Sequence, residues 1–148
     1  MDTVWAINFK KLNEYAQTPT QGSAAAAGLD LYAAIEEPVA IPAHWTMKIG
    51  TGISIELPDA TFGAIFARSG LATKEGLRPA NCVGVVDSDY RGEIVVALHN
   101  DSEEVRTIEP KERIAQLVVM PYIPVTLVET QNLSDTDRGD GGFGSTGK

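Results

Sequence analysis

Cysteine is nearly absent from this 148-residue chain, in which Cys82 is the only one. A single thiol excludes an intramolecular disulfide and any cluster of cysteines around zinc or iron-sulfur. Cys82 follows Asn81 in an apolar stretch, and no histidine is near it in the sequence. We therefore expect a small packed side chain at this position rather than a nucleophile.

Long apolar runs and an excess of basic residues are missing as well. No apolar run is long enough to cross a bilayer, and residues 1–5 lack the pattern of a secretion signal, so we expect a cytoplasmic protein without membrane contact. The net charge is −8, and the twelve lysines and arginines are scattered, which argues against nucleic-acid binding. An acidic chain can still bind a small phosphate compound through a few aimed side chains, backbone amides or a divalent cation.

Helical periodicity is scarce, whereas short apolar stretches separated by turn residues are frequent. The patterns predict strands over residues 4–9, 29–34, 49–57, 62–67, 84–86, 94–98 and 113–120. One short helix is expected over residues 69–76, with Ser69 as its N-cap and Gly76 at its end. Because there is no βαβ rhythm and no internal repeat, we predict an all-β barrel or sandwich over residues 1–133.

The most informative stretch covers residues 84–98. Two apolar β-branched residues lead into a polar segment, and the chain returns as a second apolar run, which predicts a β-hairpin with a polar tip. Asp87 lies where the first run ends and solvent begins, so its carboxylate is placed to act as a base. The alternative is that Asp87, Ser88 and Asp89 only accept hydrogen bonds from the backbone amides of the turn.

Two further stretches carry polar groups, one just after a predicted strand and one within a strand. Arg68, Ser69 and Gly70 follow a predicted strand at the start of the helix, where they form either a phosphate cradle or an ordinary helix cap. Gln116 is polar within an apolar run, so its amide needs partners. Those partners are either backbone groups of the core or a ligand in a site.

Residues 134–148 differ in composition from the rest of the chain. They contain five glycines and one large apolar side chain, Phe143. Such a segment cannot bury enough apolar surface to order itself, so we predict a flexible C-terminal tail. Its glycine amides are donors that can wrap around phosphate.

Five stretches of the chain together resemble, in sequence and in order, the homotrimeric deoxyuridine triphosphate nucleotidohydrolases (dUTPases). They are residues 27–31 (AGLDL), 67–72 (ARSGLA), 84–92 (GVVDSDYRG), 113–117 (RIAQL) and 138–147 (RGDGGFGSTG). The resemblance implies a jelly-roll-like β-barrel, a trimer with active sites between subunits, and Mg²⁺ as cofactor. It also implies hydrolysis of dUTP to dUMP and pyrophosphate by water attack on the α-phosphorus. That reaction limits uracil incorporation into DNA and supplies dUMP for dTMP synthesis.

The resemblance also implies roles for individual residues. Asp87 is the expected base, and Gln116 is expected to order water or hold phosphate. Asp30 is expected to hold the hydration shell of a triphosphate-bound Mg²⁺ through water, as suits an ion that keeps its waters. The expected phosphate-binding residues are Arg68, Ser69, Gly70, Arg138, Gly144, Ser145 and Thr146. The expected uracil- and deoxyribose-binding residues are Asn81, Gly84, Val85, Tyr90 and Phe143, with residues 134–148 closing as a lid.

Two other functions stay open at this point. A dCTP deaminase is similar in fold and also binds a pyrimidine triphosphate. A dUTPase-like nucleotide sensor with a protein partner is the second alternative. Asp87, Gln116 and Arg138 are all present, which argues against loss of catalysis, and an extra partner is compatible with any of these functions.

Overall fold

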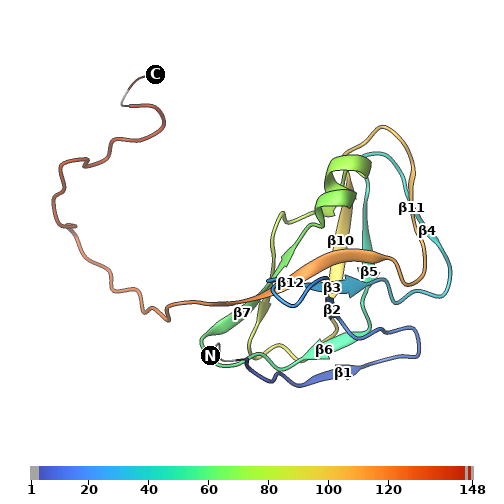
Figure 1. Ribbon diagram of the computed structural model, residues 1–148. Coiled ribbons are helices and arrows are strands. Elements are labelled where there is room, and N and C mark those ends of the chain that lie inside the picture. Colours follow the sequence, from blue (N-terminus) through green and yellow to red (C-terminus); the bar gives the residue numbers. More distant parts are fainter. Residues whose placement is uncertain (1–3, 146, 148) are drawn as a thin grey trace.

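The computed structural model describes residues 4–145 and residue 147. Within them the chain forms twelve strands and one short helix, η1 (Leu71–Glu75), so the predicted all-β architecture is confirmed (Figure 1). The strands are β1 (Phe9–Lys11), β2 (Thr20–Gln21), β3 (Leu29–Tyr32), β4 (Val39–Ile41), β5 (Thr46–Gly50), β6 (Ile53–Ile55), β7 (Thr61–Phe66), β8 (Leu77–Pro79), β9 (Gly84–Asp87), β10 (Val95–Asn100), β11 (Arg106–Ile108) and β12 (Arg113–Pro121).

The strands pair antiparallel in four sheets. The largest has the order β2-β3-β12-β7-β9, and a second has the order β5-β10-β8. Two ribbons, β1-β6 and β11-β4, complete the body. Apolar side chains from all four sheets meet in one core that excludes water, which is the main stabilising contribution in a fold of this size. The largest fully buried apolar side chains are Leu31, Ile41, Ile49, Ile53, Leu77, Leu98, Ile108, Ile114 and Leu117.

The predicted alternation of faces holds on β3 and is interrupted on its neighbours. On β3, Leu31 and the following Ala33 are fully buried, whereas Asp30 and Tyr32 lie on the other face, as a period-2 pattern requires. On β12, Ile114 and Ala115 are both buried, and on β7 the three residues 63–65 are buried in succession. Both faces of the middle of β7 are therefore covered.

The predicted hairpin at residues 84–98 is wrong. Strand β9 pairs with β7 in the five-stranded sheet, whereas β10 pairs with β5 and β8 in the other sheet. Residues 88–94 thus cross from one sheet to the other. Two apolar strands joined by a polar segment are the pattern of a hairpin and also of a crossing between two sheets. The pattern does not tell which strand each of them pairs with.

Two other strand predictions need correction. Residues 4–8 form no strand, and β1 begins only at Phe9. Among the described residues, one backbone hydrogen bond reaches this segment, from the Glu56 amide to the Asn8 carbonyl, so residues 4–8 lack the partner that a strand needs. The predicted strand over residues 49–57 is divided between β5 and β6. Gly52 has a φ of 65°, a left-handed conformation that breaks the strand and sends the chain to another sheet.

Two local predictions are also wrong. Cys82 is exposed in the turn between β8 and β9, with a φ of 66°, so it is not a packed side chain. The cap of η1 is Gly70, without a side-chain hydrogen bond, in place of the expected Ser69 cap. The predicted end of the helix is confirmed, because Gly76 adopts the left-handed conformation and donates to the Leu71 carbonyl.

One ion pair joins β8 to the end of β10. The Arg78 Nε atom lies 2.7 Å from an Asp101 carboxylate oxygen, and the Arg78 guanidinium holds the pKa of Asp101 below its ordinary value. No helix among the described residues is long and apolar enough to cross a membrane. The cytoplasmic location expected from the sequence stays a prediction.

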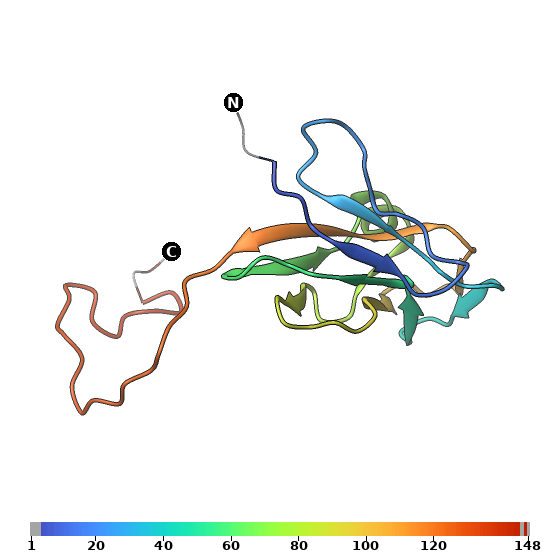
Figure 2. The same ribbon diagram turned by 90° about the horizontal axis from the view of Figure 1, so that it is seen from below.

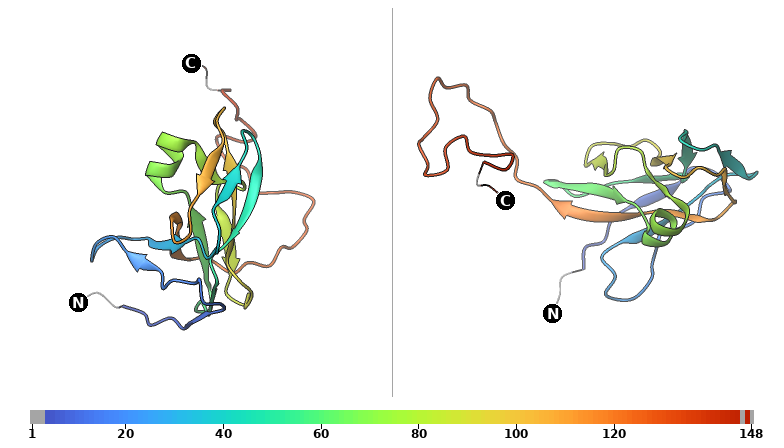
Figure 3. Two further views of the ribbon diagram at one scale, coloured as in Figure 1. Left: turned by 90° about the vertical axis from the view of Figure 1, so that its right-hand side faces the viewer. Right: turned by 90° about the horizontal axis from the view of Figure 1, so that it is seen from above.

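The chain leaves the body after β12. Residues 122–145 form no strand, and after Tyr122, which still contacts the body, the segment runs away from the sheets (Figures 1 and 2, and the right-hand view of Figure 3). Residues 122–133 carry large apolar side chains that are more than four-fifths exposed: Ile123, Leu127, Val128 and Leu133. Among the described residues nothing covers these four side chains. The division of the chain at residue 133 stays a prediction.

Candidate active site

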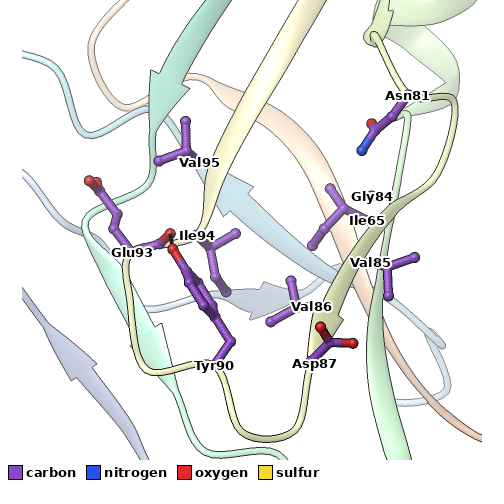
Figure 4. A pocket seen from close by; sticks show the side chains of 10 residues that line it. All are labelled: Ile65, Asn81, Gly84, Val85, Val86, Asp87, Tyr90, Glu93, Ile94 and Val95. Atoms are coloured by element: carbon purple, nitrogen blue, oxygen red, sulfur yellow. Dashed lines mark hydrogen bonds between the residues drawn. The ribbon is translucent and has the colours of Figure 1, made fainter.

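The segment from β8 to β10 encloses a pocket of about 250 Å³, which we call the Asp87 pocket (Figure 4). Asp87 stands at the end of β9, and Tyr90 rises from the crossing loop beside it. Asn81 faces them from the turn after β8. The predicted base and the four body residues predicted to contact uracil or deoxyribose line this one pocket: Asp87, Asn81, Gly84, Val85 and Tyr90.

The backbone geometry of β9 explains why glycine begins this strand. A side chain at Gly84 would place its Cβ atom 3.0 Å from the Cβ atom of Ile65 on β7, which is tighter than most packed contacts and would push the two strands apart. Gly84 therefore lets β9 approach β7 closely and leaves backbone groups open at the pocket. Ile65, Val86 and Ile94 are buried and form the apolar part of the lining.

Backbone groups and Arg91 close the crossing loop. The Tyr90 amide donates to the Asp87 carbonyl at 3.1 Å, and the Arg91 Nη1 atom donates to the Ser88 carbonyl at 2.7 Å. Among residues 4–145, the side chains of Asp87, Ser88 and Asp89 make no hydrogen bond to the turn. The alternative in which these side chains serve only the turn therefore lacks support, and the Asp87 carboxylate is exposed at the pocket.

A second pocket, of about 160 Å³, lies at the ends of the central strands, and we call it the Arg68 pocket. Register explains its composition, because Asp30 on β3 pairs with Gln116 on β12, which pairs in turn with Phe66 on β7. Arg68 follows β7 by two residues and so reaches the same place. The lining consists of residues predicted for phosphate, water and magnesium: Asp30, Arg68, Ser69, Gly70 and Gln116.

Charge-assisted contacts fix the Arg68 pocket. The Arg68 Nε atom lies 3.1 Å from Asp30 Oδ1, and the Arg113 Nη1 atom lies 3.6 Å from Asp30 Oδ2. The Asp30 side chain is only 14% exposed, so the two guanidinium groups offset the cost of burying its charge. Arg113 was not among the predicted site residues, and its position follows from a bulge between residues 113 and 115 that the sequence does not show.

The Gln116 amide has both a backbone partner and a close neighbour. Its Nε2 atom donates to the Ala67 carbonyl at 3.0 Å, as expected for a half-buried amide. A Cβ atom at Gly28 would overlap Gln116 Oε1, so the glycine leaves room for the amide in its present position. Gly28 is a second residue that shapes the site and that was not among the predicted site residues.

The two pockets are separate in the single chain and share no lining residue. Asp87 pairs with Phe62, whereas Gln116 pairs with Phe66, four residues further along β7. At the usual rise of a strand, these two positions are about 13 Å apart along β7. One chain therefore holds the candidate base and the candidate phosphate site at two places.

The tail residues lie in neither pocket. The Arg138 Nε atom donates to the Gly141 carbonyl at 2.6 Å, and the Phe143 side chain is fully exposed. Gly144 and Ser145 are exposed as well, whereas Thr146 lies outside the described residues. The predicted site residues thus fall into three groups: the Asp87 pocket, the Arg68 pocket and the tail.

Comparison with known proteins decides the family. The family model described as dUTPase matches residues 14–147, which is nearly the whole chain. The chain belongs to the dUTPase family. The deoxyuridine 5'-triphosphate nucleotidohydrolase of Hydrogenobaculum is 47% identical over 138 residues, covering 93% of this chain and 95% of the relative. The enzyme of the same name from Desulfitobacterium hafniense is 45% identical over 142 residues, covering 95% and 94%.

Solved structures of dUTPases share the fold. A mutant dUTPase of Staphylococcus bacteriophage 80alpha, solved with dUpNHpp, has a TM-score of 0.89 and 26% identity, covering 97% of this chain and 99% of that one. The dUTPase of phage phi11 of S. aureus, for which a structural Mg(II) ion is described, has a TM-score of 0.76 and 22% identity, covering 86% and 97%. The jelly-roll-like dUTPase fold predicted from the sequence is confirmed by these likenesses.

The donor set of this dUTPase fits a magnesium ion held mainly by a ligand. No group of three His, Cys, Asp or Glu side chains suited to a metal occurs in the part of the chain that the structure describes. Asp30 is the one carboxylate that lines the Arg68 pocket, and both its oxygens already face guanidinium groups. Such a carboxylate suits an outer contact to metal-bound water, because Mg²⁺ commonly keeps several waters and binds substrate phosphates.

Proposed function

We propose that this chain hydrolyses dUTP to dUMP and pyrophosphate, with a water molecule attacking the α-phosphorus. The observation that carries the proposal is that the two pockets hold different chemical groups. The Asp87 pocket has an exposed carboxylate beside apolar side chains, and the Arg68 pocket has an arginine and an amide. Attack on a phosphorus crowded by negative charge requires both a base and neutralisation of that charge.

In the Asp87 pocket, the Asp87 carboxylate would accept the proton of the attacking water. The Asn81 amide and the backbone at Gly84 and Val85 would contact the polar edge of uracil, where a 5-methyl group would collide with backbone. The Tyr90 ring would lie under the deoxyribose and exclude a 2′-hydroxyl. These roles are supported by the shared pocket and by the close approach of β9 to β7.

In the Arg68 pocket, the Arg68 guanidinium would bind phosphate oxygens as a forked donor, with Ser69 and Gly70 beside it. Gln116 would order the water or hold a phosphate oxygen. Mg²⁺ bound to the triphosphate would neutralise charge, and Asp30 would hold its water shell. Support comes from the ion pairs that fix Asp30 and Arg68 and from the space beside Gly28 that the Gln116 amide occupies.

We further propose that the protein is a homotrimer whose active sites combine groups from different subunits. Two separate pockets and a tail that reaches neither leave each site incomplete within one chain. The exposed apolar side chains of residues 122–133 need a cover, and a neighbouring subunit would supply one. Residues 134–148 would then close over bound nucleotide as a lid, with Phe143 against the base and Arg138, Gly144, Ser145 and Thr146 near the phosphates.

A substrate comparison tests this function. Pyrophosphate release should be fast with dUTP and slow with dTTP, dCTP and UTP, and it should depend on added Mg²⁺. Ammonia release from dCTP would instead indicate a deaminase. Tight binding of dUTP without pyrophosphate release would indicate a nucleotide sensor, and either result would overturn the proposal.

A further inference from the structure

Glu93, at the end of the crossing loop, has a half-buried side chain that none of the proposed catalytic steps uses. Its Oε2 atom accepts a hydrogen bond from the Gly52 amide at 2.8 Å. The carboxylate points away from the Asp87 pocket, although the backbone of Glu93 lines it (Figure 4). Because this carboxylate points away from the pocket, we expect its role to be structural. It ties the crossing loop to the turn between β5 and β6.

The β5-β6 turn is shaped to receive this carboxylate. A Cβ atom at Gly50 would lie 2.5 Å from Glu93 Oε2, and the three atoms nearest to that position all belong to the Glu93 carboxylate. Gly52 has a φ of 65° and presents its amide to the same oxygen. The bare Cα atom of Gly50 and the amide of Gly52 thus form a socket that the Glu93 carboxylate occupies.

The socket is linked directly to Tyr90. The Tyr90 hydroxyl donates to the Glu93 backbone carbonyl at 2.8 Å, and a Cβ atom at Gly92 would lie within 2.4 Å of the same hydroxyl oxygen. Neighbouring contacts hold the rest of the loop, since the Ser54 hydroxyl donates to the Arg91 carbonyl and the Thr51 hydroxyl donates to the Ile94 carbonyl. The position of the Tyr90 ring therefore depends on where Glu93 is fixed.

We propose that Glu93, seated in the socket of Gly50 and Gly52, is a positioning residue that sets the discrimination between deoxyribose and ribose. The inference rests on the proposed function, in which the Tyr90 ring excludes a 2′-hydroxyl. Exclusion by contact requires a ring that cannot yield, because a side chain that moves by a fraction of an ångström admits the larger sugar. Glu93 fixes the loop so that the ring keeps its place.

The measured quantity is the ratio of kcat/KM for UTP to that for dUTP. Glu93→Ala empties the socket, and we expect this ratio to rise about tenfold, toward the value of Tyr90→Ala. Glu93→Gln keeps an oxygen that can accept from the Gly52 amide, and its ratio should stay within about threefold of wild type. A general loss of stability would lower both activities together and leave the ratio unchanged.

A double-mutant cycle tests the socket itself. Gly50→Ala alone pushes Glu93 out and should raise the ratio as Glu93→Ala does. In the Glu93→Ala background the three atoms nearest to the added methyl group are gone, so Gly50→Ala should then have little further effect. If the effects of the two substitutions on the ratio multiplied, the socket would be contradicted. Where Glu93→Ala folds poorly, the ratio of Gly50→Ala alone still tests it.

Glu56→Ala is the matched control for charge. Glu56 is exposed on β6's outer end and lies 3.8 Å from Arg91 of the same loop, so its removal deletes one carboxylate near the loop without emptying the socket. Its ratio should remain that of wild type. The inference is overturned if Glu93→Ala leaves the ratio unchanged or if Glu56→Ala raises it equally. A wild-type protein that fails to prefer dUTP would instead overturn the proposed function.

Discussion

At the scale of single residues, the chemistry of this dUTPase depends on where a few polar groups meet apolar strands. Asp87 is exposed at the end of β9, one residue after the buried Val86, so it reaches the pocket without being surrounded by core. Asp30 is the opposite case, a mostly buried carboxylate between two arginines. An accessible carboxylate can exchange protons with water, whereas a paired one is better suited to holding charge in place.

Replacing Asp87 by Asn tests its role as the base. The amide is nearly the same size, so the fold and the affinity for a non-hydrolysable dUTP analogue should be retained. Turnover of dUTP should fall roughly 100-fold or more, because general-base catalysis contributes on that order. Steady-state pyrophosphate release and calorimetric binding measure the two effects. A variant with near wild-type turnover would leave Asp87 as a turn residue only.

The sequence predicted the members of both pockets better than the contacts that hold them. Gly84 and Tyr90 belong to the stretch 84–92, Asn81 was expected from the family resemblance as a whole, and the structure places all three in one cavity. Glu93 and Gly28 were missed, because their importance arises from contacts with residues more than 40 and 80 positions away. Such pairings depend on which strands become neighbours, and a single sequence does not carry that information.

At the scale of elements, strand identity was predictable and strand partnership was not. Strand β3 follows clear alternation, β7 and β12 are apolar runs, and all three were predicted close to their observed bounds. The error over β9 and β10 concerned pairing, since each strand exists but belongs to a different sheet. The crossing loop between those sheets carries Tyr90 and Glu93, so this error concealed the link between the pocket and the β5-β6 turn.

Asn100 is the polar residue whose loss should most affect this arrangement of strands. It is fully buried at the end of β10, and its Nδ2 atom donates to the carbonyls of Ile41 and Glu104. Its Oδ1 atom accepts from both the amide and the hydroxyl of Ser102. Asn100→Ala removes these buried hydrogen bonds, so the free energy of unfolding should fall by about 3 kcal/mol.

Urea denaturation at a fixed protein concentration measures this change, because stability of an oligomer depends on concentration. Asn132→Ala is the control, since Asn132 is exposed and its side chain makes no hydrogen bond within residues 4–145. Equal stabilities of the two variants would contradict this prediction, because they would show that water replaces the hydrogen bonds of Asn100.

At the scale of the whole molecule, the site requires parts that one chain keeps apart. The tail illustrates this, because its glycines carry a large ordering entropy and Phe143 has no apolar contact in the single chain. Bound nucleotide would supply a base for Phe143 to stack on, a contact worth about 1 to 3 kcal/mol. Closure would also exclude water from the triphosphate and align it for attack.

Truncation after Asp137 tests the lid. The shortened protein should keep its fold and its melting temperature, because the removed residues make no contact with the sheets in the described structure, and it should lose most of its turnover. A Phe143→Trp variant should change its emission with a non-hydrolysable dUTP analogue and not with the dTTP equivalent. Wild-type protein, with Trp5 and Trp45 only, is the blank. Full activity after truncation would show the tail to be a passive extension.

Mixed trimers test whether each site is shared between subunits. Asp87→Asn disables the Asp87 pocket and Arg68→Ala disables the Arg68 pocket, so each variant alone should be nearly inactive. When the two variants carry different tags and are produced together, purification on both tags yields trimers that contain both kinds of subunit. In a ring of three, such a trimer has one junction where an intact Asp87 pocket meets an intact Arg68 pocket, so about a third of wild-type activity should return. Sites built within single chains would instead give no more activity than the average of the two variants, because no intact chain is present.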